Sequence, residues 1–161
     1  MAQQHGFGYD AAVRAVEASD ARWAGDLDPQ FDRRALTRFA HALAFAVEET
    51  PRWVETVTYP GLADTAELEV RVLTTSVLAV VTTPWSAGGD SPEPTVKLRP
   101  LRLLNAIEVD GFVFGADGLP AGCTITLLFE DAAAVRLGAA PGADRAVLAA
   151  MLPSLRSLLM R

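Results

Sequence analysis

The chain has 161 residues, of which half are hydrophobic, and a formal net charge of −6 from 14 basic and 20 acidic residues. This is enough chain for a hydrophobic core without disulfides, and the acidic balance disfavours nucleic-acid binding, which rests on clustered Lys and Arg. Cys123 is the only cysteine, which excludes an intramolecular disulfide and a multi-cysteine zinc site. We expect a single α+β domain over residues 1–161.

Targeting signals are absent from the pattern of the first residues. Residues 1–9 carry no basic region followed by an apolar one, and no later stretch approaches the roughly 18 apolar residues of a membrane span. We therefore expect no membrane association and a cytoplasmic protein, with residues 1–9 flexible. Lys97 is the only Lys among the 14 basic residues, a skew typical of a GC-rich, bacterial genome.

Two helices are predicted in the first 50 residues. The first has Asp10 as its N-cap and ends near Gly25, where a left-handed residue is common. The second begins at Asp28 with Pro29 in its first turn, and it ends before Thr50-Pro51. Its apolar stripe needs a surface on which to pack, and it consists of Leu36, Phe39, Ala40, Leu43 and Val47.

Three strands of an antiparallel sheet are predicted next, over residues 53–58, 67–73 and 77–83. The apolar row changes phase between Val72 and Val77, so residues 73–76 form a turn or a bulge, and we favour a turn. Charged residues alternate with this row. They predict cross-strand ion pairs on a hydrated face or, alternatively, a charged recognition face, and they are Glu67, Glu69, Arg71, Lys97 and Arg99.

The segment 85–94 is rich in Gly and Pro and predicts an exposed loop, and strands follow on both sides of Pro100. Asp110-Gly111 predicts a hairpin turn. Cys123 begins an inward apolar row that runs to Phe129, and a short strand near residues 135–137 completes the expected sheet. The sequence thus predicts one antiparallel sheet of about five or six strands, packed by two N-terminal helices and one C-terminal helix.

The C-terminal helix is predicted over residues 143–160, kinked near Pro153. Its apolar residues, among them Leu155 and Leu158, cover more than one side, so the helix needs two neighbours. We expect the second neighbour to be another subunit, which predicts a homodimer. The alternative is that the N-terminal helices cover that side.

Motifs for chemistry are missing. No Gly-rich phosphate loop and no Gly-x-Ser-x-Gly elbow is present, and His5 and His41 are the only histidines. We predict no catalytic residue, no metal site and no cofactor. Weak candidates for a polar site are His41, which shares a helix flank with Glu48, and Asn105, which interrupts an apolar row.

Aromatic and apolar residues are better candidates for contacts with a partner or a ligand. Trp85 borders the Gly- and Pro-rich segment, and Phe112 and Phe114 share one face of a short strand. Packing at the edge of the core is the alternative for all three. With Leu155 and Leu158, they are the predicted contact residues.

These features favour a non-enzymatic protein-interaction module, such as an adaptor, a chaperone-like protein or a regulatory partner. The order of elements resembles that of secretion chaperones and related small adaptors in architecture alone, and no motif matches. The alternative is a small-ligand-binding or enzyme-like fold whose curved sheet forms a pocket lined by Asn105, His41 or Trp85. A structural component of a larger assembly is the third possibility.

Overall fold

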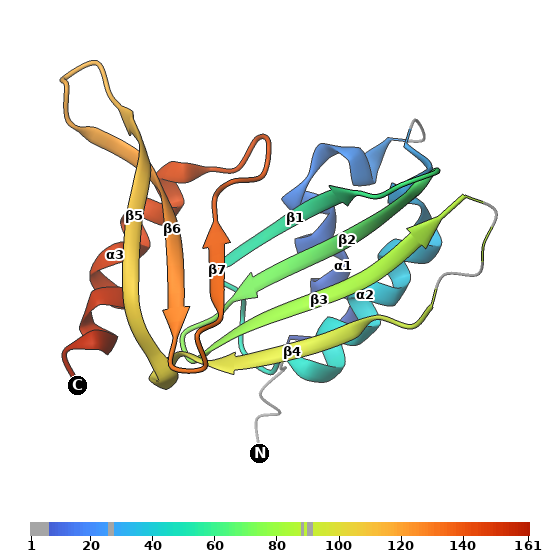
Figure 1. Cartoon of the computed structure of the whole chain (residues 1–161), viewed down its shortest axis with the longest axis horizontal. Helices are drawn as coiled ribbons and strands as arrows, with labels where there is room; N and C mark the ends of the chain where they lie inside the picture. The colour runs from blue at the N-terminus through green and yellow to red at the C-terminus, as the bar shows by residue number, and fades with distance from the viewer. Residues whose placement is uncertain (1–6, 26–27, 88, 90–91) are drawn as a thin grey trace. The chain divides into compact units, whose positions relative to one another are not determined.

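The computed structural model describes residues 7–25, 28–87, 89 and 92–161. The chain divides into two compact units, residues 1–99 and 100–161, and each has its own antiparallel sheet with helices on one face (Figure 1). The α+β class and the three predicted α-helices are confirmed within the described residues. The predicted single sheet is instead two sheets of four and three strands.

The first unit begins with helices whose starts are fixed by Asp side chains. Asp28 Oδ1 accepts from Gln30 N at 3.1 Å, and Asp32 Oδ1 accepts from Ala35 N at 2.7 Å, so each Asp caps its own helix. The helix predicted from Asp28 is therefore a short 3₁₀ turn followed by a separate α-helix. The helical elements are α1 (Tyr9–Ser19), η1 (Ala21–Ala24), η2 (Pro29–Phe31) and α2 (Arg33–Ala46).

The sheet of this unit has the order β1-β2-β3-β4, from β1 (Trp53–Pro60), β2 (Thr65–Leu73), β3 (Val77–Ser86) and β4 (Thr95–Pro100). Thr74 N donates to Val77 O at 2.9 Å and closes a tight hairpin, so the predicted turn is confirmed. Trp85 belongs to β3 and not to a loop, because β3 pairs with β2 as far as Ser86.

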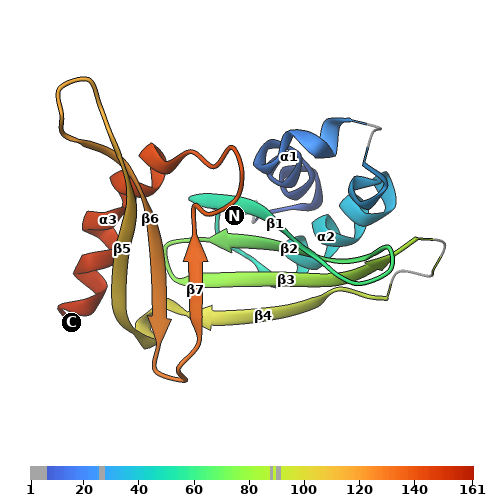
Figure 2. The same cartoon turned by 45° about the horizontal axis from the view of Figure 1, so that its top comes forward.

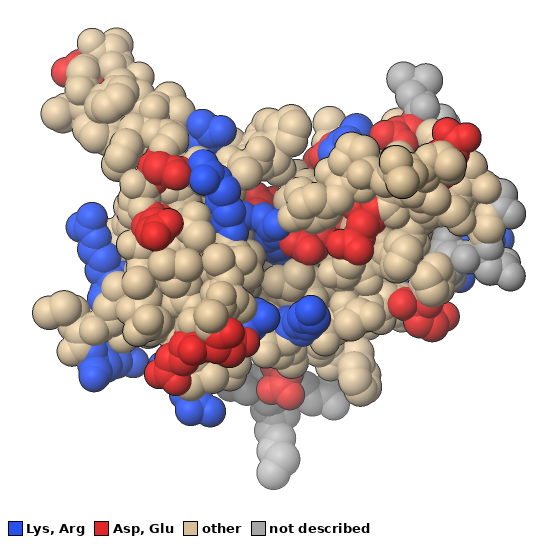
Figure 3. Space-filling model, viewed as in Figure 1, with Lys and Arg blue, Asp and Glu red and all other residues tan. Residues whose placement is uncertain are grey.

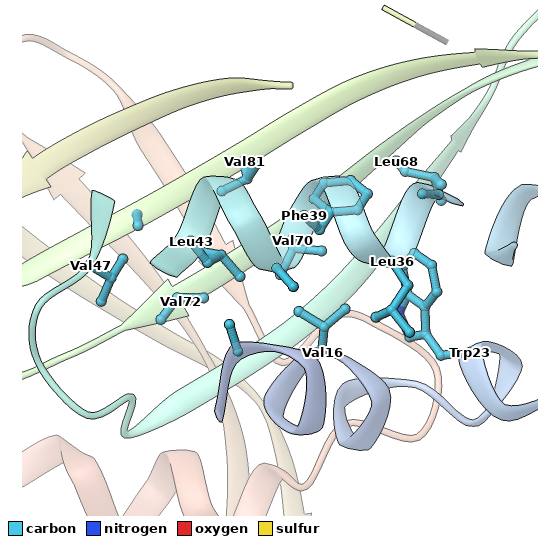
Figure 4. Close-up of a cluster of buried hydrophobic side chains, with 14 of the residues drawn as sticks. Val16, Trp23, Leu36, Phe39, Leu43, Val47, Leu68, Val70, Val72 and Val81 are labelled. Carbon is cyan, nitrogen blue, oxygen red and sulfur yellow. The ribbon is translucent and has the colours of Figure 1, made fainter. Parts of the chain in front are cut away.

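The core of the first unit lies between one face of this sheet and the helices (Figure 4). Leu68, Val70 and Val72 alternate along β2 and contact the buried face of α2, which presents Phe39 and Leu43. The apolar stripe predicted for the helix and the alternating apolar residues predicted for the strand thus pack against each other in one core. Of the segment predicted to be flexible, residues 1–6 lie outside the described residues, Phe7 is buried, and Tyr9 begins α1.

The second unit is a three-stranded sheet with one helix on it. Its order is β5-β6-β7, and α3 packs against β6 and β5 (Figure 2). The predicted inward row is confirmed, since Cys123 and Ile125 are buried, and burial raises the pKa of the Cys123 thiol. The elements are η3 (Leu101–Leu103), β5 (Leu104–Phe114), β6 (Pro120–Phe129), β7 (Ala134–Leu137) and α3 (Arg145–Leu159), and Pro153 lies inside α3.

The prediction of a hairpin turn at Asp110-Gly111 is wrong. Strand β5 continues through these residues, and its register with β6 shifts between Asp110 and Val113. Gly111 has φ +57°, a conformation that suits a β-bulge as well as a turn, so the dipeptide alone could not distinguish the two. None of the described helices is long and apolar enough to span a membrane.

Candidate interaction surface

A two-stranded arm extends from the second unit beyond the bulge. We define the arm as residues 112–121, the ends of β5 and β6 with the turn between them. Gly115 N donates to Leu119 O at 2.9 Å and closes the turn. Strand β7 pairs only with Ile125–Leu128 of β6, so the arm has no third strand (Figure 1).

The arm exposes large apolar side chains. Phe112 is 50% exposed, Phe114 62% and Leu119 64%, while Val113, which points to the other face, is 46% exposed. The rings of Phe112 and Phe114 lie side by side with 6.4 Å between their centroids. Exposed apolar side chains gathered in one place are typical of an interaction surface, whereas single ones are ordinary.

The root of the arm is tied to the start of α3. Arg145 Nη1 donates to Gly111 O at 3.4 Å, and Arg145 Nε donates to Gly138 O at 3.1 Å. Gly122 faces the same residue so closely that a Cβ there would lie 3.0 Å from Arg145 Cβ. The bulge and these contacts fix the direction in which the arm leaves the sheet.

The arm carries little charge. Asp117, in its turn, is its one charged residue, and the tip of the arm in the space-filling view, at upper left, is tan apart from one acidic group (Figure 3). Asp117 Oδ1 accepts from Leu119 N at 3.0 Å and so stabilises the turn. The surface offered to a partner is therefore apolar with a single carboxylate.

Of the predicted contact residues, Phe112 and Phe114 thus lie together on this arm. Leu155 is buried on the sheet-facing side of α3 with Leu148 and Met151, and Leu158 is half-buried. The exposed large apolar residues at the helix are Val147, its last residue Leu159, and Met160, which follows it.

Trp85 lies in the first unit, beside a hollow of about 420 Å³. Pro60, Ala66 and Pro92 line it together with Trp85, and Trp85 pairs with Ala66 across β2 and β3. Neither His41 nor Asn105 is among the described residues that line this hollow. Of the three residues predicted to line a small-ligand pocket, only Trp85 therefore lines this hollow.

The weak polar candidates are all exposed. The ring of His41 stacks on that of Tyr9 with 4.4 Å between centroids, and Glu48 follows the end of α2. Asn105 is exposed on β5. The described part of the chain holds no cluster of three or more His, Cys, Asp or Glu residues placed for a metal ion.

The structure contains a buried ionic network that the sequence pattern did not predict. Arg71 is 7% exposed and not hydrated as predicted; its Nη1 donates to Glu55 Oε1 at 3.2 Å and its Nε to Glu69 Oε1 at 2.6 Å. Its Nη2 donates to Tyr59 Oη at 2.5 Å. Burial alone would lower the pKa of Arg71, but the hydrogen bond to Glu69 and the nearby charges outweigh it and raise the pKa.

The network could not be inferred from alternation alone. Glu55 stands opposite Arg71 in the β1–β2 register, and its side chain is 1% exposed. The signal was an acidic and a basic residue on neighbouring strands, but the pattern does not tell a hydrated face from a buried one. Because the charge of Arg71 pairs with those of Glu55 and Glu69, we assign these residues a structural role in the sheet.

Comparison with known proteins adds no assignment to this geometry: the chain matches no protein-family model, no curated protein and no solved structure.

Proposed function

We propose that this chain is a non-enzymatic protein-interaction module, an adaptor or regulatory partner, and that the arm of residues 112–121 is its contact surface. The single observation that carries the proposal is the exposure of Phe112, Phe114 and Leu119 on one short projecting hairpin. Aromatic side chains anchored on a rigid element supply large contact area for little loss of conformational freedom, which makes them frequent hot spots of interfaces.

The arm also meets the requirement of a preformed surface. The contacts of Arg145 with Gly111 hold its root, and the hydrogen bonds of Asp117 and Gly115 hold its turn. A partner therefore meets an arm whose backbone is already held in place, and less binding free energy is lost in ordering it. We also propose that the protein is a homodimer that acts in the cytoplasm and does not bind nucleic acid, in keeping with its free thiol and net charge of −6.

The test is affinity capture from the native host with three baits. The wild-type chain should retain a partner that the variant Phe112→Ser/Phe114→Ser loses. Phe45→Ser is the matched control, because Phe45 is 94% exposed on α2, outside the arm, and its loss should leave capture unchanged. Equal capture by the wild type and the arm variant would contradict the proposal.

A further inference from the structure

We propose that the arm of one copy of this chain docks in a groove on the first unit of a second copy, reciprocally, so that two identical contacts form a homodimer. This inference rests on the proposed function, because it names the partner of the arm. It is argued from the residues that form the arm and from the residues that line the groove.

The groove lies between α1 and the start of β1 and has a volume of about 570 Å³, within the range of pockets that hold a ligand. Small side chains of α1, those of Ala11, Ala15 and Ala18, line one side. Pro51 and Val54 line the other. Because these three alanine side chains are short, a partner can approach the helix backbone closely beside them.

The charges of the groove complement the arm. Arg14 and Arg52 are among its lining residues, and no acidic residue is among the described residues that line it. The chain as a whole carries a net charge of −6, so a basic groove differs from its average surface. The arm brings two Phe rings and the single carboxylate of Asp117, which would meet Arg14 when the rings lie against the alanines.

Two other described hollows suit the arm less well. Glu17, Asp28 and Asp32 line the hollow beneath Trp23, where they would repel Asp117. The hollow beside Trp85 is smaller and includes Glu67. A second copy supplies both halves of the contact, and reciprocal docking closes the assembly at two subunits, since each arm and each groove is then used.

The test uses light scattering on three purified proteins. The wild type should have twice the mass of the chain. The arm variant Phe112→Ser/Phe114→Ser and the groove variant Arg14→Glu/Ala18→Trp should each be monomeric, and all four positions are exposed, so both variants should fold like the wild type by circular dichroism. Phe45→Ser should remain dimeric.

Mixing the two variants provides the decisive comparison. The arm of the groove variant fits the groove of the arm variant, so an equimolar mixture should form a dimer held by one of the two contacts, which the separate proteins do not form at the same concentration. A monomeric wild type, either variant staying dimeric, or a mixture no more associated than the separate variants up to the highest concentration tested would each overturn the inference. If the wild type is monomeric while capture from the host still depends on Phe112 and Phe114, the arm has another partner, and only this inference fails.

Discussion

The rings of Phe112 and Phe114 lie with 6.4 Å between their centroids on one face of β5, and at least half of each residue is exposed. Neither ring is in the core of its unit, where Ile125 and Leu127 are fully buried. These two neighbouring rings therefore contribute little to the stability of the fold and present apolar surface to the solvent. Their small contribution to stability can be measured.

Phe114→Ser should leave the stability of the fold almost unchanged. Because 62% of Phe114 is exposed, we expect the free energy of unfolding to change by about 0.5 kcal/mol or less, as at ordinary surface positions. Urea unfolding followed by circular dichroism measures it. Ile125→Ala, at a fully buried position, is the contrasting variant and should cost about 2–5 kcal/mol. A similar loss in Phe114→Ser would place Phe114 in the core.

Arg71→Met should destabilise the first unit strongly. It removes Arg71 as the cation that pairs with Glu55, which is 1% exposed, and breaking a buried ion pair in this way costs about 3–5 kcal/mol. The double variant Glu55→Leu/Arg71→Met should be less destabilised than Arg71→Met alone, because no unpaired charge remains at the pair. A double variant whose loss equals the sum of the two single losses would show that the pair is not coupled.

Glu49 should make stability depend on acid pH. Hydrogen bonds from the hydroxyls of Ser76 and Thr75, together with Thr75 N, lower the pKa of Glu49 from 4.5 to about 2. A carboxyl whose pKa is lower in the folded state stabilises the fold above its unfolded pKa, and this contribution is lost as the pH falls from about 4.5 towards 2.

An NMR titration of the Glu49 carboxyl measures this pKa directly. In Ser76→Ala the strongest of these hydrogen bonds is gone, so the midpoint should move up towards the ordinary value for Glu. An unchanged midpoint in the variant would show that Ser76 does not hold the carboxylate.

Gly111→Ala should distort the root of the arm. Gly111 has φ +57°, and an added Cβ would lie 2.5 Å from Thr124 Oγ1. Gly118→Ala is the matched control, since Gly118 has φ +75° but no atom within 4 Å of the added Cβ. Both variants carry the cost of a left-handed residue, about 1 kcal/mol, and Gly111→Ala should lose more stability in urea unfolding. Equal losses would mean that Thr124 moves aside freely.

The sequence predicts the local elements well wherever burial alone sets the pattern. The alternation of Leu68, Val70 and Val72 locates β2, and the change of phase before Val77 locates the β2–β3 turn, which Thr74 closes. It predicts Phe112 and Phe114 as contacts because two aromatic residues at a spacing of two share one strand face.

The rest depends on pairing between distant strands. Asp110-Gly111 has the same backbone preference in a turn and in a bulge, and only the pairing of β5 with β6 decides between them. The burial of Arg71 depends on Glu55, which lies 16 positions away. Likewise, the division into two sheets is set by where β4 ends and β5 begins, around Pro100.

The role of the arm is tested most directly by the dissociation constant of its partner, whether a second copy or a captured protein, measured for the wild type and for Phe112→Ser/Phe114→Ser. We expect the arm variant to bind at least about 30-fold more weakly, as for the loss of a hot-spot side chain. Phe45→Ser should bind within about twofold of the wild type. Equal affinity of the arm variant and the wild type would contradict the claim that this arm is the interaction surface.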